Sequence, residues 1–188
     1  HPVVLKIQSL IKKKAIGKVI FARAECGFYL PNWHPWEDYR KFYMAKKKLG
    51  GGSILDQSHL IDMCHFLFGE AKEILGCFNS RVSNLKVNTD DIVKMIIKFK
   101  NGIVGNIHQD MIGRDHKKNI EIICENGNIL WDVYNLSVEI YNAKTKKTKK
   151  FTFGKNHNLM YENQTNHMLE ILSKKTKPKI SLEEGIHT

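Results

Sequence analysis

The spacing of apolar residues predicts three helices and the start of a fourth. Apolar side chains recur three and four positions apart over residues 3–14, and Gly17 marks the end of that helix. The same spacing returns over residues 53–68 and again over about 159–174, ahead of Pro178. Residues 181–188 resemble the beginning of another helix.

A β-like pattern, rich in Val, Ile and aromatic residues, predicts strands in the rest of the chain. The predicted strands are residues 17–27, 71–82, 89–100, 102–112, 119–125, 128–134, 136–143 and 149–154. Asn101-Gly102 and Asn126-Gly127 are strong hairpin signals, so we expect a run of consecutive hairpins. Helices at both ends and a meander between them indicate an α+β fold. Its largely antiparallel open β-sheet has helices packed on one face.

Length and composition fit one domain over residues 1–188. The chain is 42% hydrophobic with nine Phe, six Tyr and three Trp, which is enough apolar bulk for a core. No stretch approaches the roughly 18 apolar residues of a membrane span, and the first residues lack the order of a signal peptide. We therefore expect a cytoplasmic protein without a membrane partner.

The net charge of +11 is due mainly to lysine, since only four of the 30 basic residues are arginine. Proteins that read bases and phosphates usually rely on arginine forks. The lysine run at 144–150 lies between two predicted strands, where edge lysines oppose aggregation of sheets. A solvated surface is therefore favoured over a nucleic-acid partner. A non-enzymatic basic module that binds an acidic partner stays open as an alternative function.

The cysteines add little chemistry. Cys26, Cys64, Cys77 and Cys124 are far apart and lie among apolar neighbours, so we expect buried, reduced thiols. The helix at 53–68 carries His, Asp and Cys residues, which are metal-ligand types. One helix offers no tetrahedral set at a recognised spacing, so no metal site is predicted.

The helix at 53–68 holds the most informative polar residues. Its apolar side chains cover most of the circumference, which predicts a helix buried nearly all round. Asp56, His59 and Asp62 follow an i, i+3, i+6 stripe, in which carboxylates can orient an imidazole and raise its basicity. Such a group suits a general acid/base. The alternative is structural: Asp56 would belong to a helix cap with Ser53, and His59 would bond a backbone carbonyl.

The loop at 29–48 is irregular and aromatic, and it precedes this helix. It contains Trp33, His34, Trp36, Tyr39 and Arg40. Flat aromatic faces beside a cation suit a sugar-like substrate, with Tyr39 and Arg40 expected to face the ligand more than Trp33. A satellite core that pins the loop is the alternative reading. The run Gly50 to Gly52 is interpreted as a flexible approach to the helix rather than a phosphate cradle.

Four segments together resemble a known family. In chain order they are GKVIFARAECGFYLPNWHPWEDYR, KLGGGSILDQSHLIDMCHFLFGE, EIICENGNILWDVY and SLEEG. They resemble the C-terminal domain of the glucose-fructose oxidoreductase, inositol dehydrogenase and MocA family of NAD(P)-dependent oxidoreductases. The glycine run followed by an Asp, a His and an Asp is the most specific part of the resemblance. It implies a glyceraldehyde-3-phosphate dehydrogenase-like C-terminal domain.

The resemblance also implies an activity. In that family a separate Rossmann domain binds NAD or NADP, while this domain supplies the substrate wall and, through its open sheet face, a homo-oligomer contact. The residue matching His59 is the acid/base for the hydroxyl proton of a sugar or polyol, and Asp62 matches the acidic residue that follows. With the aromatic loop, the candidate substrate-binding residues are Asp56, Tyr39, Arg40, Trp36 and His34.

Two departures from the family pattern bear on these expectations. The family's more common acidic partner stands four residues before the histidine, where this chain has Leu55, and Asp56 is three before. No GxGxxG follows a strand, and no segment matches the family's first domain with its Lys-Pro motif, since the pair Lys177-Pro178 follows the predicted helix at about 159–174. We therefore expect residues 1–188 to be a substrate-binding and oligomerisation domain truncated at both ends and inactive alone.

Overall fold

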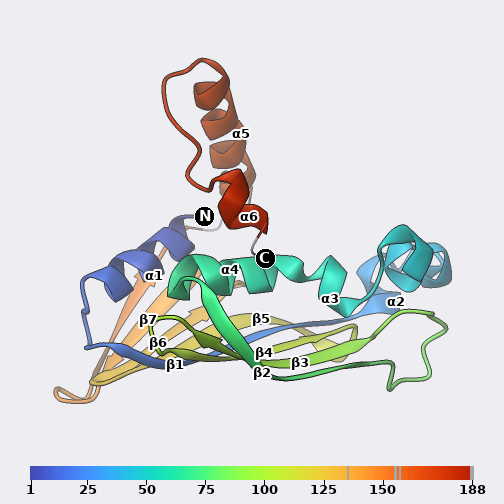
Figure 1. Cartoon of the computed structure of the whole chain (residues 1–188), viewed down its shortest axis with the longest axis horizontal. Coiled ribbons are helices and arrows are strands. Elements are labelled where there is room, and N and C mark those ends of the chain that lie inside the picture. The colour runs from blue at the N-terminus through green and yellow to red at the C-terminus, as the bar shows by residue number, and fades with distance from the viewer. Residues whose placement is uncertain (135, 155, 157, 187–188) are drawn as a thin grey trace.

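The computed structural model describes residues 1–134, 136–154, 156 and 158–186, and it shows an eight-stranded sheet with helices against one face (Figure 1). The strands are β1 (Val19–Tyr29), β2 (Ala71–Ser80), β3 (Ile92–Phe99), β4 (Val104–Asp110), β5 (Ile112–Cys124), β6 (Gly127–Asp132), β7 (Ser137–Asn142) and β8 (Lys147–Thr152). The helices are α1 (Pro2–Lys12), α2 (Leu30–Trp33), α3 (Ser53–Asp56), α4 (Ser58–Phe68), α5 (Leu159–Leu172) and α6 (Leu182–Ile186). The loop before α3 contains the 3-10 turns η1 (Tyr39–Lys41), η2 (Tyr43–Ala45) and η3 (Lys47–Leu49). The predicted α+β fold is confirmed.

The strands lie in the order β2-β3-β4-β1-β5-β6-β7-β8. Neighbouring strands are antiparallel except for the parallel pair β1–β4. The hairpin prediction is right for β2 to β4 and for β5 to β8. It is wrong at β4 and β5, which follow each other in the chain but are separated by β1. The lysine run lies at the β7–β8 turn and on the edge strand β8, as expected.

The core lies between the helix layer and one face of the sheet. The helices contribute Val3, Ile7, Leu10, Leu60, Cys64, Leu67 and Phe68. Alternate residues of β1 and β3 meet them: Ala22, Ala24, Cys26, Val93, Met95, Ile97 and Phe99. This period of two leaves the intervening residues, Arg23 and Lys94 among them, on the open face. Cys77 corrects the cysteine prediction, because it is exposed on the edge strand β2.

The helix predicted over 53–68 breaks at Gln57, between α3 and α4. The buried Gln57 side chain donates to the Asp110 carbonyl at 2.9 Å, and the Gln57 backbone carbonyl accepts from Gln109 Nε2 at 2.5 Å. These bonds hold the junction against the end of β4. Burial all round is also wrong: Leu55 is 58% exposed, because the helices form a single layer whose outer side is open.

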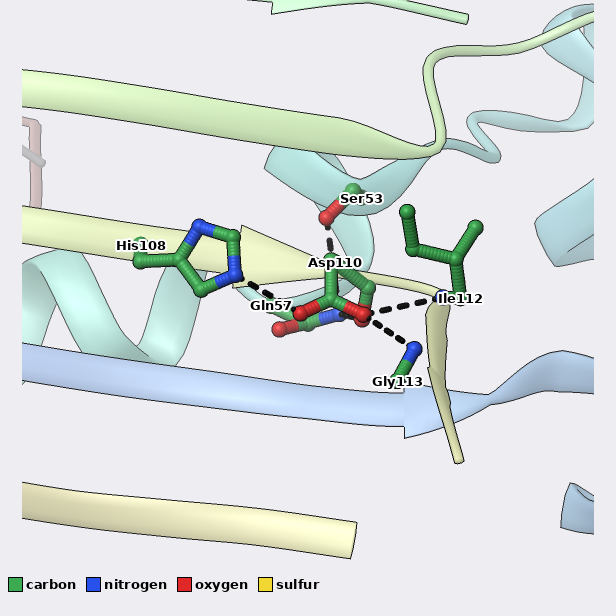
Figure 2. Close-up of polar contacts among 6 residues, drawn as sticks. All are labelled: Ser53, Gln57, His108, Asp110, Ile112 and Gly113. Carbon is green, nitrogen blue, oxygen red and sulfur yellow. Dashed lines mark hydrogen bonds and ion pairs between the residues drawn. The ribbon is translucent and has the colours of Figure 1, made fainter. Parts of the chain in front are cut away.

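Asp110 lies at the place where the chain passes from β4 to β5 (Figure 2). Met111 alone separates these strands, which flank β1 on opposite sides. The Asp110 carboxylate accepts from the backbone N–H groups of Ile112 and Gly113 at 2.9 and 2.5 Å. It also accepts from His108 Nε2 at 2.8 Å. Gly27 leaves room for this carboxylate, since a Cβ there would lie 2.4 Å from Asp110 Oδ2.

Two of the three glycines before α3, Gly51 and Gly52, are closely packed rather than part of a flexible approach, whereas Gly50 is exposed. A Cβ on Gly51 would lie 2.1 Å from the Tyr43 carbonyl oxygen. Gly52 has a φ of 118°, and a Cβ there would lie 2.3 Å from Asp90 Oδ1. Only glycine permits this close approach without displacing the neighbours. The run therefore brings η2 against the start of α3.

Of the C-terminal helices, α5 projects away from the sheet, whereas α6 lies close to the outer side of α4 (Figure 1). α5 has no buried residue, and its exposed apolar side chains include Tyr161, Met168, Leu169 and Leu172. α6 begins with a capping box in which Ser181 and Glu184 exchange hydrogen bonds. His187 and Thr188, which the helix-start prediction included, lie outside the described residues. No helix in the described part of the chain is long and apolar enough to cross a membrane.

Candidate functional site

His59 is exposed near the N-terminus of α4. Desolvation by the surrounding protein and the positive charge of Lys118 lower the pKa of the imidazole below its usual 6.5. Asp56, through its carboxylate and its backbone carbonyl, raises the pKa of His59, and so does the Asp62 carboxylate. Together they raise it by less than burial and Lys118 lower it. The ring is therefore neutral near pH 7 and can accept a proton from a substrate hydroxyl.

Asp56 is held by Tyr43 of η2, whose hydroxyl donates a hydrogen bond to the carboxylate. This bond, partial burial and the Asp56 charge raise the pKa of Tyr43 to about 12, so the hydroxyl keeps its proton. The capping role considered for Asp56 belongs to Asp90, which accepts from the Ile54 N–H at 2.9 Å. Asp56 thus remains beside His59 although it lies across the helix break.

Lys118 supplies the cation on the sheet side of the site. The β1–β5 register pairs it with Cys26, so both side chains lie on the helix-covered face. The Val133 N–H donates to the Lys118 carbonyl at 3.0 Å, which fixes the backbone there. Lys118 is half-buried, and burial lowers its pKa. Burial likewise raises the pKa of Cys26 to about 11, which keeps that thiol neutral.

An aromatic cluster adjoins Lys118. His116 lies two residues before it on the same face of β5, and its ring centroid is 5.4 Å from Trp33 and 5.1 Å from Tyr134. Burial and Lys118 lower the pKa of His116. From Trp33 the rings continue to His34 and Trp36 in stacked arrangement, with centroids 6.2 and 5.2 Å apart. The aromatic cluster therefore extends from His116 of β5 along the loop to Trp36.

Tyr39 and Arg40 differ from the expectation that they face a ligand more than Trp33. The Tyr39 hydroxyl accepts from the Lys86 N–H at 3.1 Å, and its ring packs against a second core cluster that includes Met44. Arg40 is exposed and pairs with Asp38 through two bonds of 2.8 Å. Tyr39 has the role of the satellite-core alternative, whereas Trp33 contacts the residues beside Lys118.

Three residues of the site were missed in the sequence: Tyr43, His116 and Lys118. The last two are two positions apart on a strand, so they share a face, but that face becomes relevant only when β5 pairs with β1. Tyr43 lies in the irregular loop and gave no signal. The structure places Asp62 close enough to His59 for its charge to act on that ring.

Neither a metal ion nor a dinucleotide fits the described residues. Within residues 1–134, 136–154, 156 and 158–186, no three His, Cys, Asp or Glu side chains are placed to hold a metal ion. Dinucleotide binding needs a glycine-rich turn between a strand and a helix with its N–H groups free for phosphate. The described glycine run follows a 3-10 turn and packs against the Tyr43 carbonyl instead, so it does not fit that group.

Comparison with known proteins places this fold in one class, the C-terminal domains of the GFO/IDH/MocA family. The model of the GFO/IDH/MocA C-terminal domain matches residues 4–130, and the chain belongs to this family. Comparison with curated protein sequences gives no significant match.

Several solved structures share the fold. A putative NADPH-dependent oxidoreductase from Desulfitobacterium hafniense has a TM-score of 0.78 at 14% identity, covering 97% of this chain and 55% of its own. A putative oxidoreductase from Thermotoga maritima has a TM-score of 0.73 at 17% identity, covering 99% and 54%. Levoglucosan dehydrogenase in complex with NADH has a TM-score of 0.69 at 22% identity, covering 81% and 44%. The chain thus spans about half the length of these proteins.

Proposed function

We propose that this domain is the substrate-binding half of an NAD(P)-dependent oxidoreductase that acts on a hydroxyl of a sugar, sugar derivative or polyol. The observation that carries the proposal is the placement of His59 between Asp56 and Asp62 at the junction of α3 and α4, in a chain of the GFO/IDH/MocA family. The levoglucosan dehydrogenase structures, one of them with levoglucosan bound, favour a sugar-like substrate. Three buried free thiols, at Cys26, Cys64 and Cys124, fit a cytoplasmic location.

The roles that we propose for this domain and for a separate dinucleotide-binding domain follow from the residues that this domain contains. A nicotinamide cofactor, held by a separate dinucleotide-binding domain, supplies hydride chemistry. His59 takes the hydroxyl proton, because oxidation of a carbinol needs that proton to leave. Asp56 and Asp62 stabilise the imidazolium that results. Tyr43 holds Asp56 in place, and the rings of Trp33 and His116 offer flat faces for the substrate.

The test is reduction of NAD(P)⁺ that depends on added sugar or polyol, measured with this domain joined to its dinucleotide-binding domain. We expect turnover there. We expect the 188-residue chain alone to show neither turnover nor submicromolar affinity for NADH by calorimetry, because no phosphate-cradling turn lies in its described residues. Tight NADH binding by this chain would contradict the proposed division between the domains.

We also propose self-association through the open sheet face. That face carries partly exposed apolar residues, including Ile96 of β3 and Leu130 of β6, next to Arg23 and Lys94. Sedimentation should show a species heavier than the monomer as the concentration rises. Ile96→Lys and Leu130→Lys should each return the chain to the monomer. Ile186→Lys on α6, which is more exposed but lies off this face, is the matched control. A mass of one chain at high concentration would contradict the prediction.

A further inference from the structure

Lys118 is a half-buried cation beside the candidate acid/base, and no residue of the proposed mechanism uses it. We infer that the substrate carries an anionic group, a carboxylate or a phosphate, and that Lys118 binds it. The inference rests on the proposed function and adds a substrate class to it. Both sources of negative charge present the same chemistry to the ammonium group: oxygen atoms that accept charge-assisted hydrogen bonds.

The pairing of β1 with β5 determines on which face of the sheet the Lys118 side chain lies. It pairs with Cys26 in the β1–β5 register, while the next pair is Lys117 and Gly27. Side chains of a strand alternate between faces, so Lys118 lies on the helix-covered face and Lys117 on the open face. Lys117 is exposed and Lys118 half-buried, as this alternation requires. Two adjacent lysines of one strand thus differ in surroundings and form a matched pair.

Lys118 has no carboxylate partner among the described residues. The lysines that form ion pairs there are Lys98 with Glu73, Lys100 with Glu70 and Lys150 with Glu139. The Asp56 carboxylate of the site is bonded to Tyr43. Placing an ammonium group in a half-buried position without a counter-charge costs free energy. An anionic ligand would supply that counter-charge.

The groups around Lys118 fit such a ligand. His59 of α4 and His116 of β5 are both within its electrostatic reach, and both have pKa values lowered by burial and by Lys118. The two imidazoles are therefore neutral near pH 7, and Lys118 is the charged member of the trio. A sugar with its anionic group at Lys118 would have the His116 and Trp33 rings on one side. His59 would then be available to a carbinol hydroxyl.

The experiment uses the 188-residue chain and follows the His59 and His116 ring signals by NMR. D-Glucuronate, D-glucose 6-phosphate and inorganic phosphate are the anionic probes, and D-glucose is the neutral one. We expect at least one sugar anion to bind and to raise the pKa of His59, because its charge offsets Lys118. Preferential binding of glucuronate would indicate that the anionic group of the substrate is a carboxylate, and preferential binding of glucose 6-phosphate would indicate a phosphate.

The variants assign the effect to one side chain. Lys118→Met should weaken binding of that anion by about tenfold or more and abolish the pKa response, whereas Lys118→Arg, which keeps the charge, should retain both. Lys117→Met is the matched control and should change neither. Equal binding of glucose and the sugar anions, no binding of either anion, or full binding by Lys118→Met would overturn the inference. A turnover assay of His59→Asn tests the proposed function separately, so the two can fail independently.

Discussion

Replacing His59 by Asn should lower turnover by about 10²- to 10⁴-fold in the enzyme that joins this domain to its dinucleotide-binding domain. The asparagine side chain keeps the approximate shape and a hydrogen-bonding group but cannot accept the hydroxyl proton. His59 is exposed and contributes nothing to the buried core, so the fold should survive. Steady-state kinetics gives the size of the loss, and circular dichroism checks the fold.

The pH profile separates an acid/base from a structural histidine. Oxidation needs neutral His59, so wild-type turnover should fall as the pH drops through the pKa of His59, which lies below 6.5. Asp62→Asn removes a charge that raises this pKa, so the acidic limb should move to lower pH with a smaller loss of turnover. Lys118→Met removes a charge that lowers it, so the limb should move to higher pH. If His59→Asn kept most of its kcat, the proton acceptor would have to be another group.

The sequence revealed the half of the site that lies on one continuous segment. His59 and Asp62 are polar positions in an apolar helical pattern, and three residues of separation place them together whatever the rest of the fold does. Asp56 was also identified, although its helix ends there. That break could not be predicted, because it depends on the bonds of Gln57 to Asp110 and Gln109, residues more than 50 positions away.

The other half of the site depends on pairing between distant strands. Hairpin signals predicted the neighbours within β2 to β4 and within β5 to β8, since those contacts are local. Nothing local indicates that β1 lies between β4 and β5, and this insertion is what sets Lys118 opposite Cys26. The loop is a similar case: its aromatic residues were visible in the sequence, but the bond of the Tyr39 hydroxyl to the Lys86 N–H and the contact of Trp33 with His116 depend on distant segments.

Asp110→Ala should lower the free energy of unfolding by about 3 kcal/mol, because it leaves three donors without an acceptor. Those donors are the N–H groups of Ile112 and Gly113 and the Nε2 of His108 (Figure 2). The Asp110 side chain is only 8% exposed, so water cannot readily replace it. Urea denaturation should show the loss as a lower midpoint. Asp38→Ala is the matched control: that carboxylate holds exposed Arg40, so its removal should change the midpoint little.

The charge of Asp110 should also be visible in the pH dependence of stability. Burial raises the pKa of this carboxyl, but the hydrogen bonds from His108, Ile112 and Gly113 outweigh it and hold the pKa below the usual 3.8. A group whose pKa is lower in the folded state stabilises the fold above its unfolded pKa. It loses that contribution as the pH falls through the folded value. Wild-type stability should therefore drop below about pH 4 more steeply than that of Asp110→Asn, which has no such proton to bind. Equal acid sensitivity of the two proteins would mean that the carboxylate charge does not hold the β4–β5 passage, and that the amide serves there equally well.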